Sequence, residues 1–228
     1  MQDFESCDPG SNPGGAMMKL VLTSAGITNQ SIENSIKKLL NQQNPKIAFI
    51  PTAANTKNGG KGWLIDHLNE FRNLGEIDII DIAALKKEIW LPKLKQSNII
   101  VMGGGDTTYL MNQIKNSGLI KELPQLLKDK IYVGISAGSI VLCPTLFGNS
   151  EYLHSNHKQK SIKGLNYVDF HFRPHLNSPS FPKVIDKNLK EIAKKINKPL
   201  YALDNNSAIF ISNNKLKIIS EGQYIKYN

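Results

Sequence analysis

Short apolar runs alternate with amphipathic segments over the first two thirds of the chain. Runs at 19–23, 47–50, 77–82, 98–102 and 131–135 predict buried strands. Between them, apolar residues recur at helical spacing, as at Ile32, Ile36 and Leu39 and again from Trp63 to Phe71. Repeated strand–helix units predict an α/β fold with a mainly parallel sheet covered by helices on both faces. Ligands of such folds bind at the carboxyl ends of the strands.

The pattern is looser after residue 138. A short helix through Ile140 and Leu142 is expected to stop near Pro144, and a polar stretch follows. Further strands are predicted at 167–172, 200–202, 208–212, 216–219 and 223–227, with a lysine-rich helix at 183–196. Asn213-Asn214 predicts a hairpin between two of these strands. We expect one domain over 17–228, and we interpret residues 1–16 as a disordered leader or an expression remnant.

Composition narrows the choice of partners and compartment. The chain has 228 residues and a net charge of +9, but only Arg72 and Arg173 are arginines, and lysines spread over helices usually form solvated faces. No aromatic-interleaved basic motif accompanies the charge, so nucleic-acid binding is not expected. Cys7 and Cys143 resemble neither a disulfide framework nor a metal site. No signal or membrane span is recognised, which favours a reducing cytoplasm.

One strand runs directly into a candidate nucleophile. The segment Gly134-Ile135-Ser136-Ala137-Gly138 has the form G-x-S-x-G, in which small neighbours allow a strained strand-to-helix turn to present a hydroxyl over the sheet edge. The competing interpretation is a glycine-rich turn with a capping serine.

A catalytic serine requires a histidine to take its proton. His175 is the preferred candidate, because Pro174 stiffens its backbone just past a predicted strand. The other candidates are less suitable: His67 on a helix surface, His154 and His157 in the polar stretch, and His171 inside a strand. With an ordinary imidazole as base, activity should fall as the pH drops through about 6 to 7.

The remaining parts of such a site are less determined. The acid that orients the histidine is open among Glu151, Asp169, Asp186 and Asp204. The amide of Ala137 follows the serine and would bind an oxyanion, and Gly105 could supply a second amide. The triple glycine at 103–105 lacks the third glycine of a dinucleotide fingerprint, which argues against a nucleotide site.

Four segments together resemble a known family. They are Gly103-Gly104-Gly105-Asp106-Thr107, the G-x-S-x-G segment, Cys143-Pro144-Thr145 and Pro174-His175, and they resemble peptidase E, an aspartyl dipeptidase, and its cyanophycinase-like relatives. The resemblance runs through most of residues 18–212. It implies a three-layer α/β/α sandwich similar to class I glutamine amidotransferases, which is flavodoxin-like, and no cofactor or metal. It also implies Ser136 as nucleophile, His175 as base, Glu151 as third member, and Gly105 and Ala137 as oxyanion donors.

The chain departs from this family near the histidine. Peptidase E has Asn-Pro-His where this chain has Arg173-Pro174-His175, and its Gly-Glu-Thr-Arg stretch is missing after His175. Arg173 could replace that stretch by holding a substrate carboxylate in a bidentate contact. We also assign Asp106 to substrate binding.

These residues predict a serine hydrolase that cleaves dipeptides or short peptides through an acyl-enzyme, with a preference for an acidic N-terminal residue. An esterase or amidase on the same scaffold, or a non-catalytic binder of small ligands, are the alternatives. The expected partner is a short peptide, with no nucleic acid and no membrane, and the chain is expected to be a monomer or homodimer.

Overall fold

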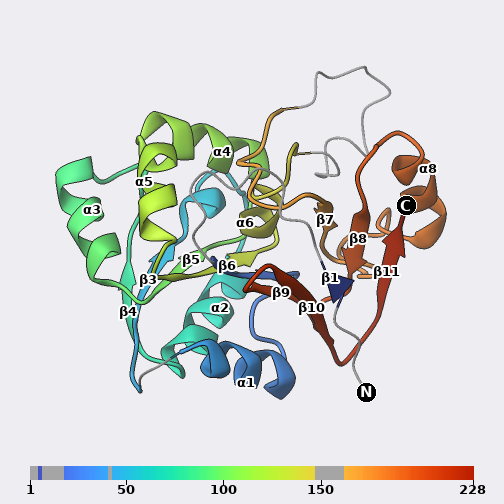
Figure 1. The fold of residues 1–228 in the computed structure, drawn as a ribbon. Helices are drawn as coiled ribbons and strands as arrows, with labels where there is room; N and C mark the ends of the chain where they lie inside the picture. Colours follow the sequence, from blue (N-terminus) through green and yellow to red (C-terminus); the bar gives the residue numbers. More distant parts are fainter. Residues whose placement is uncertain (1–4, 7–17, 41–42, 147–161) are drawn as a thin grey trace.

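The parallel half of the central sheet carries the predicted strands of the first two thirds of the chain. The computed structural model describes residues 5–6, 18–40, 43–146 and 162–228 (Figure 1). Five strands lie parallel, in the order β2 (Lys19–Thr23), β6 (Ile131–Ile135), β5 (Ile99–Met102), β3 (Lys46–Ile50) and β4 (Glu76–Ile79). Their carboxyl ends therefore meet at one edge.

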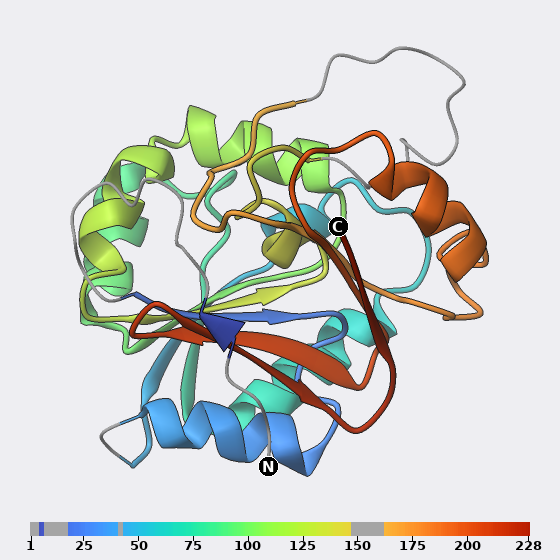
Figure 2. The same cartoon turned by 45° about the vertical axis from the view of Figure 1, so that its right-hand side comes forward.

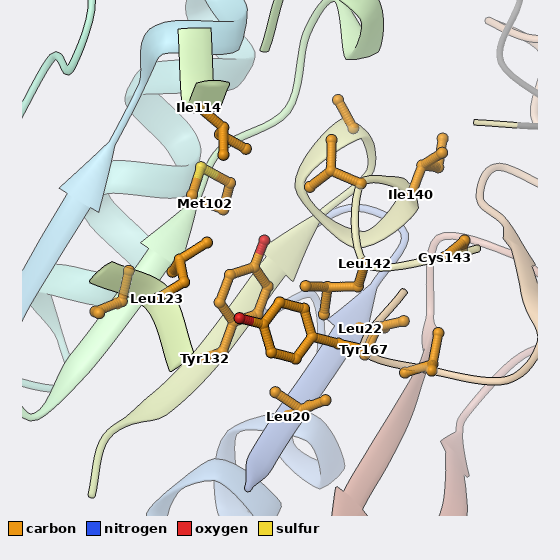
Figure 3. Packing of buried hydrophobic residues seen from close by; sticks show 14 of the residues in the cluster. Leu20, Leu22, Met102, Ile114, Leu123, Tyr132, Ile140, Leu142, Cys143 and Tyr167 are labelled. Carbon is orange, nitrogen blue, oxygen red and sulfur yellow. The ribbon is translucent and has the colours of Figure 1, made fainter. Parts of the chain in front are cut away.

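Helices cover both faces of this sheet. On one face lie α1 (Gln30–Leu39) and α2 (Gly62–Arg72), and on the other lie α3 (Lys87–Gln96), α4 (Thr107–Asn116) and α5 (Leu119–Leu126) (Figures 1 and 2). Successive strand residues point to opposite faces. Val133 belongs to the core under α1 and α2, whereas Tyr132 packs with Met102 and Leu123 on the other face (Figure 3). The predicted α/β fold with three layers is confirmed.

An antiparallel extension widens the sheet to eight strands beside β2. It consists of β9 (Ser207–Ser212), β10 (Lys215–Ser220) and β1 (Glu5–Ser6). Asn213 and Asn214 connect β9 to β10 with φ of +52° and +59°. Positive φ at both positions is the requirement of a tight hairpin turn, which asparagine tolerates, so the hairpin prediction is confirmed.

A second, three-stranded sheet lies beside the first. It contains β7 (His171–Arg173) and β8 (Leu200–Leu203), which are parallel, and β11 (Tyr224–Tyr227), which is antiparallel to β8. The helix α8 (Asp186–Ala193) packs on it through a small apolar cluster that includes Leu189 and Leu200.

Two predicted strand boundaries are wrong. The strand predicted at 167–172 begins only at His171, because the preceding residues enter the main core instead: the amide of Tyr167 donates to the Leu142 carbonyl, and its side chain is buried there (Figure 3). The strand predicted at 77–82 ends at Ile79, where the chain turns and the Asp81 carboxylate accepts from the Thr52 hydroxyl at 2.7 Å. Within the described ranges, none of the helices has the length and apolarity needed to cross a bilayer.

Candidate active site

Ser136 occupies a strained corner between β6 and the short helix α6 (Ala137–Ile140). Its φ is +49° and its ψ −103°, a conformation that costs a non-glycine residue about 1–3 kcal/mol. The Ser136 amide donates to the Thr23 carbonyl at 2.9 Å, which fixes the corner to β2. Gly134 permits the sharp return of the chain, since a Cβ there would lie 2.6 Å from the Ser139 nitrogen. Ser136 thus lies at a strained strand-to-helix turn.

The His175 imidazole reaches the Ser136 hydroxyl. The distance from His175 Nε2 to Ser136 Oγ is 2.9 Å, although 39 positions separate the two residues in sequence. His175 lies just past the end of β7 and has a φ of +67°, so its backbone is strained as well. The structure thus brings the predicted serine and histidine together at hydrogen-bonding distance.

The other imidazole nitrogen has an uncharged partner. His175 Nδ1 lies 2.8 Å from Asn205 Oδ1. An amide oxygen only accepts hydrogen bonds, so Nδ1 carries the proton and Nε2 faces the serine with a lone pair. This is the tautomer that a general base requires.

Asn205 was not among the residues predicted from the sequence. Of the four acids considered, Glu151 lies outside the described residues, and its role stays a prediction. The other three have partners elsewhere: Asp169 with Lys198 at 2.6 Å, Asp186 with Lys190 at 2.7 Å, and Asp204 with Ser207 at 2.6 Å. The signal that could have found Asn205 is the Asp-Asn-Asn turn after a predicted strand. Only the parallel pairing of β7 with β8 shows that this turn lies beside His175.

Burial keeps the imidazole neutral. It lowers the pKa of His175 from 6.5 to about 4, and the charges of Arg173 and His67 act in the same direction. The hydrogen bond to Asn205 opposes this shift but does not outweigh burial. His175 is therefore unprotonated at neutral pH, which is the protonation state of a general base.

The two predicted oxyanion donors follow the carboxyl ends of two neighbouring strands, β5 and β6. Met102 of β5 is in register with Gly134 of β6, so the segments that follow, with Gly105 and Ala137, run side by side. Gly105 has a φ of +141°, and a Cβ there would collide with the Ala53 carbonyl, so only glycine fits. Ala137 is the first residue of α6 and has no intrahelical acceptor for its amide.

Asp106 caps α4 and is not among the residues that line the cavity beside Ser136. Its carboxylate accepts from the Tyr109 amide at 2.8 Å, which satisfies a free N–H at the helix start. The structure thus gives Asp106 a local role and does not bring it to the predicted substrate-binding position.

A cavity of about 500 Å³ opens beside Ser136. Its wall includes His175, Asn205 and residues of α2, and its described cationic lining residues are Lys57 and Arg173. No aspartate or glutamate occurs among the described lining residues. The cavity therefore has a positive character.

Arg173 is a buried cation at this cavity. Its side chain is 3% exposed, and burial lowers its pKa to about 10, so that it remains charged at neutral pH. Among the described residues, its Nε has no hydrogen-bond partner and its guanidinium forms no ion pair. A buried charge without a counterion among the described residues is costly.

His67 was predicted at the surface, and this prediction is wrong. The ring lines the cavity, lies edge-on to Trp63 at 5.8 Å between ring centroids, and has its pKa lowered by burial. His171 is buried, as expected for a strand position, while His154 and His157 lie outside the described residues. In the described part of the chain, His, Cys, Asp and Glu form no group of three or more that could hold a metal ion.

Comparison with known proteins identifies the family. The model of peptidase family S51 matches residues 20–219. The chain belongs to peptidase family S51. It is therefore a serine peptidase, and the resemblance to peptidase E predicted from the four segments is confirmed.

Relatives of this S51 peptidase carry peptidase names. An uncharacterized peptidase of Pasteurella multocida is 30% identical over 184 residues, covering 78% of this chain and 86% of the relative. Peptidase E of a Nostoc species is 30% identical over 179 residues, covering 73% and 69%.

Solved structures share the fold of the S51 chain. A candidate peptidase E of Listeria monocytogenes superimposes with a TM-score of 0.74 at 23% identity, covering 91% of this chain and all of the other. A peptidase from an acI-B1 Actinobacterium gives a TM-score of 0.70 at 20% identity, covering 92% and 91%.

Proposed function

We propose that this S51 peptidase hydrolyses dipeptides or short peptides through an acyl-enzyme formed on Ser136. The observation that carries the proposal is the 2.9 Å contact between Ser136 Oγ and a neutral His175 Nε2, at a strained corner beside a cavity. A neutral imidazole at this distance can take the hydroxyl proton as the oxygen attacks a carbonyl carbon.

The reaction then runs in two steps. Ser136 Oγ bonds to the peptide carbonyl carbon while its proton passes to His175 Nε2. The amides of Gly105 and Ala137 would bind the oxyanion, and the proton moves from Nε2 to the departing amine as the C–N bond breaks. A water molecule, deprotonated by His175, then hydrolyses the ester, and Ser136 regains its proton. Asn205 would hold the productive tautomer throughout.

The cavity favours a short, acidic substrate. A volume of about 500 Å³ is in the range of small-ligand sites and suits a short segment of peptide. Arg173 would bind a carboxylate of the residue that is acylated onto Ser136, which supports a preference for an acidic N-terminal residue.

Covalent labelling tests the chemistry. A fluorophosphonate should modify Ser136 of the wild-type protein, and Ser136→Ala should abolish the modification as seen by mass spectrometry of the intact chain. Ser35→Ala is the control, because this serine lies in α1 and bonds to the Ser31 carbonyl outside the cavity. A folded wild-type protein that is not labelled would exclude the hydrolase and leave the non-catalytic ligand binder.

A substrate panel tests the peptidase against the esterase or amidase. Asp-X dipeptides, neutral dipeptides and p-nitrophenyl esters should be compared by kcat/KM. The proposal expects the acidic dipeptides to rank first, and a preference for simple esters over every peptide would favour the alternative.

Replacement of Arg173 tests the acidic preference. Arg173→Leu should raise KM for Asp-X dipeptides by about 10- to 100-fold, the effect of losing one charge-assisted contact, and leave neutral dipeptides less affected. The exposed Arg72 offers the matched control Arg72→Leu. Equal changes in KM for acidic and neutral substrates would remove Arg173 from substrate selection.

A further inference from the structure

The Phe181 ring lies flat against the proposed base. The ring centroids of His175 and Phe181 are 4.1 Å apart and the planes differ by 3°, so one face of the imidazole is covered. This aromatic residue lies in the segment after His175, where the chain departs from the family pattern.

The His175 ring needs such a face contact to be fixed. The Ser136 hydroxyl donates to Nε2 and Nδ1 donates to Asn205, so these two hydrogen bonds hold the ring at its nitrogens and define an axis through both. Rotation about that axis changes neither distance, but it tilts the lone pair of Nε2 away from the hydroxyl. A parallel ring against one face opposes this rotation.

The backbone holds Phe181 in place through two successive turns. The Phe181 amide donates to the Ser178 carbonyl at 2.9 Å, and the Val184 amide donates to the Phe181 carbonyl at 2.9 Å. The amide of Asn177 donates to the Val184 carbonyl at 2.8 Å and closes the loop. Phe181 also packs against the buried cluster that contains Val184, so its position does not depend on substrate.

We propose that Phe181 is a positioning residue that holds the His175 imidazole in its reactive plane and excludes water from one face. The proposal rests on the function proposed above. Among the described residues, the polar groups that act on the ring are Arg173 from β7, His67 from α2, and the two hydrogen-bond partners Asn205 and Ser136. Phe181 contributes packing, whereas these groups contribute charge or hydrogen bonds.

Two effects of the phenyl ring on the pKa of His175 oppose each other. Attraction of an imidazolium to an aromatic face raises the pKa by about half a unit, whereas exclusion of water lowers it. Burial is the largest cause of the shift from 6.5 to about 4. We therefore expect that opening one face of the imidazole to water outweighs the lost attraction and raises the pKa.

The test compares Phe181→Leu with Phe181→Tyr. Phe181→Leu keeps an apolar side chain without a flat face. We expect the rate of fluorophosphonate labelling to fall about tenfold, because small errors in the orientation of a catalytic group strongly reduce the rate. Phe181→Tyr restores the ring and should label within about threefold of wild type. The control Ile185→Ala removes an apolar side chain four positions later that is 38% exposed and outside the cavity, and it should label as wild type does.

Nitrogen-15 NMR titration of the histidines gives a readout that needs no turnover. In Phe181→Leu, the pKa of His175 should move from about 4 toward 6.5, and in Phe181→Tyr it should not. An unchanged titration in Phe181→Leu would overturn the proposal, as would equal losses of labelling in Phe181→Leu and Ile185→Ala. If the wild-type protein is not labelled at all, the proposed function fails, while the titration still decides the role of Phe181.

Discussion

The site lies at the carboxyl ends of two pairs of strands, and the two pairs contribute different kinds of group. At the carboxyl ends of β5 and β6, which we call the backbone edge, the chain contributes backbone: a strained corner at Ser136, and Gly105, which lines the same cavity. At the carboxyl ends of β7 and β8, which we call the side-chain edge, it contributes the side chains of His175 and Asn205. Each of these residues lies two positions past the end of its strand. At the backbone edge, a Cβ added to Gly105 or Gly134 would collide with backbone atoms. The side-chain edge depends instead on how the second sheet is held against the first.

The loop after β2 joins these two edges. The Ser24 hydroxyl donates to the Leu203 carbonyl at 2.9 Å, and the Thr28 hydroxyl donates to the Asn205 carbonyl at 2.9 Å. The Ser136 amide donates to the carbonyl of Thr23, the residue before Ser24. One short segment, from Thr23 to Thr28, therefore contacts both edges of the site. We therefore expect the effects of substitutions on catalysis to decrease from the reacting groups to this loop.

Removal of the imidazole should have the largest effect. His175→Asn keeps a residue that tolerates the positive φ but cannot act as a base, and kcat/KM for peptides should fall by about 10⁴-fold or more. The thermal midpoint should change little in the same samples. A loss smaller than about tenfold would mean that the side-chain edge is not part of the catalytic machinery.

A substitution on the backbone edge should come next. Gly105→Ala places a methyl group against the Ala53 carbonyl and should displace the amide, with a loss in kcat of about 10²- to 10³-fold, the effect of removing one oxyanion donor. Gly118→Ala is the control: its φ is +79°, but a Cβ there meets nothing within 4 Å. This control should lose stability alone, and an equal loss of kcat in both variants would assign the effect to strain.

The orienting residue should matter less, because it is neutral. Asn205→Ala should reduce kcat/KM by about 10- to 100-fold, since the imidazole loses one hydrogen bond and its fixed tautomer. Asn205→Asp places a carboxylate beside the imidazolium and should raise the pKa of His175, which moves the acid limb of the pH profile upward. Glu151→Gln tests the prediction made from the sequence: a larger loss there than in Asn205→Ala would return the third role to Glu151.

Substitutions in the loop after β2 should have the smallest effect on catalysis. Thr28→Val removes the hydroxyl that holds the Asn205 loop and should lower kcat by a few-fold, about the value of one exposed hydrogen bond. Thr28→Ser keeps the hydroxyl and should restore the rate. Identical rates for Thr28→Val and Thr28→Ser would show that other contacts suffice to hold the Asn205 loop.

The two edges also differ in how far sequence could predict them. Gly105 and Ser136 follow apolar runs with the glycines and spacing that a sharp turn requires, so local pattern located both. His175 was found because Pro174 and a strand-like run precede it. Asn205 depends on the pairing of β7 with β8, a contact between distant segments that no local pattern encodes. The cavity positions of His67 and Arg173 likewise depend on packing, although Arg173 was suggested by its rarity.

The structure also changes the pH dependence expected from the sequence, because the burial of His175 results from packing between distant segments. An exposed histidine would titrate near 6.5, but burial lowers the pKa of His175 to about 4. The folded state thus binds fewer protons than the unfolded chain between these values. The stability contributed by the neutral ring is full above about pH 6.5 and is lost as the pH falls through about 4.

The pH profile of fluorophosphonate labelling at Ser136 tests the coupling of serine and histidine most directly. We expect a wild-type rate that is half-maximal near pH 4, the value to which burial lowers the pKa of His175, and no comparable labelling of His175→Asn at any pH. A wild-type profile that His175→Asn leaves unchanged would contradict it.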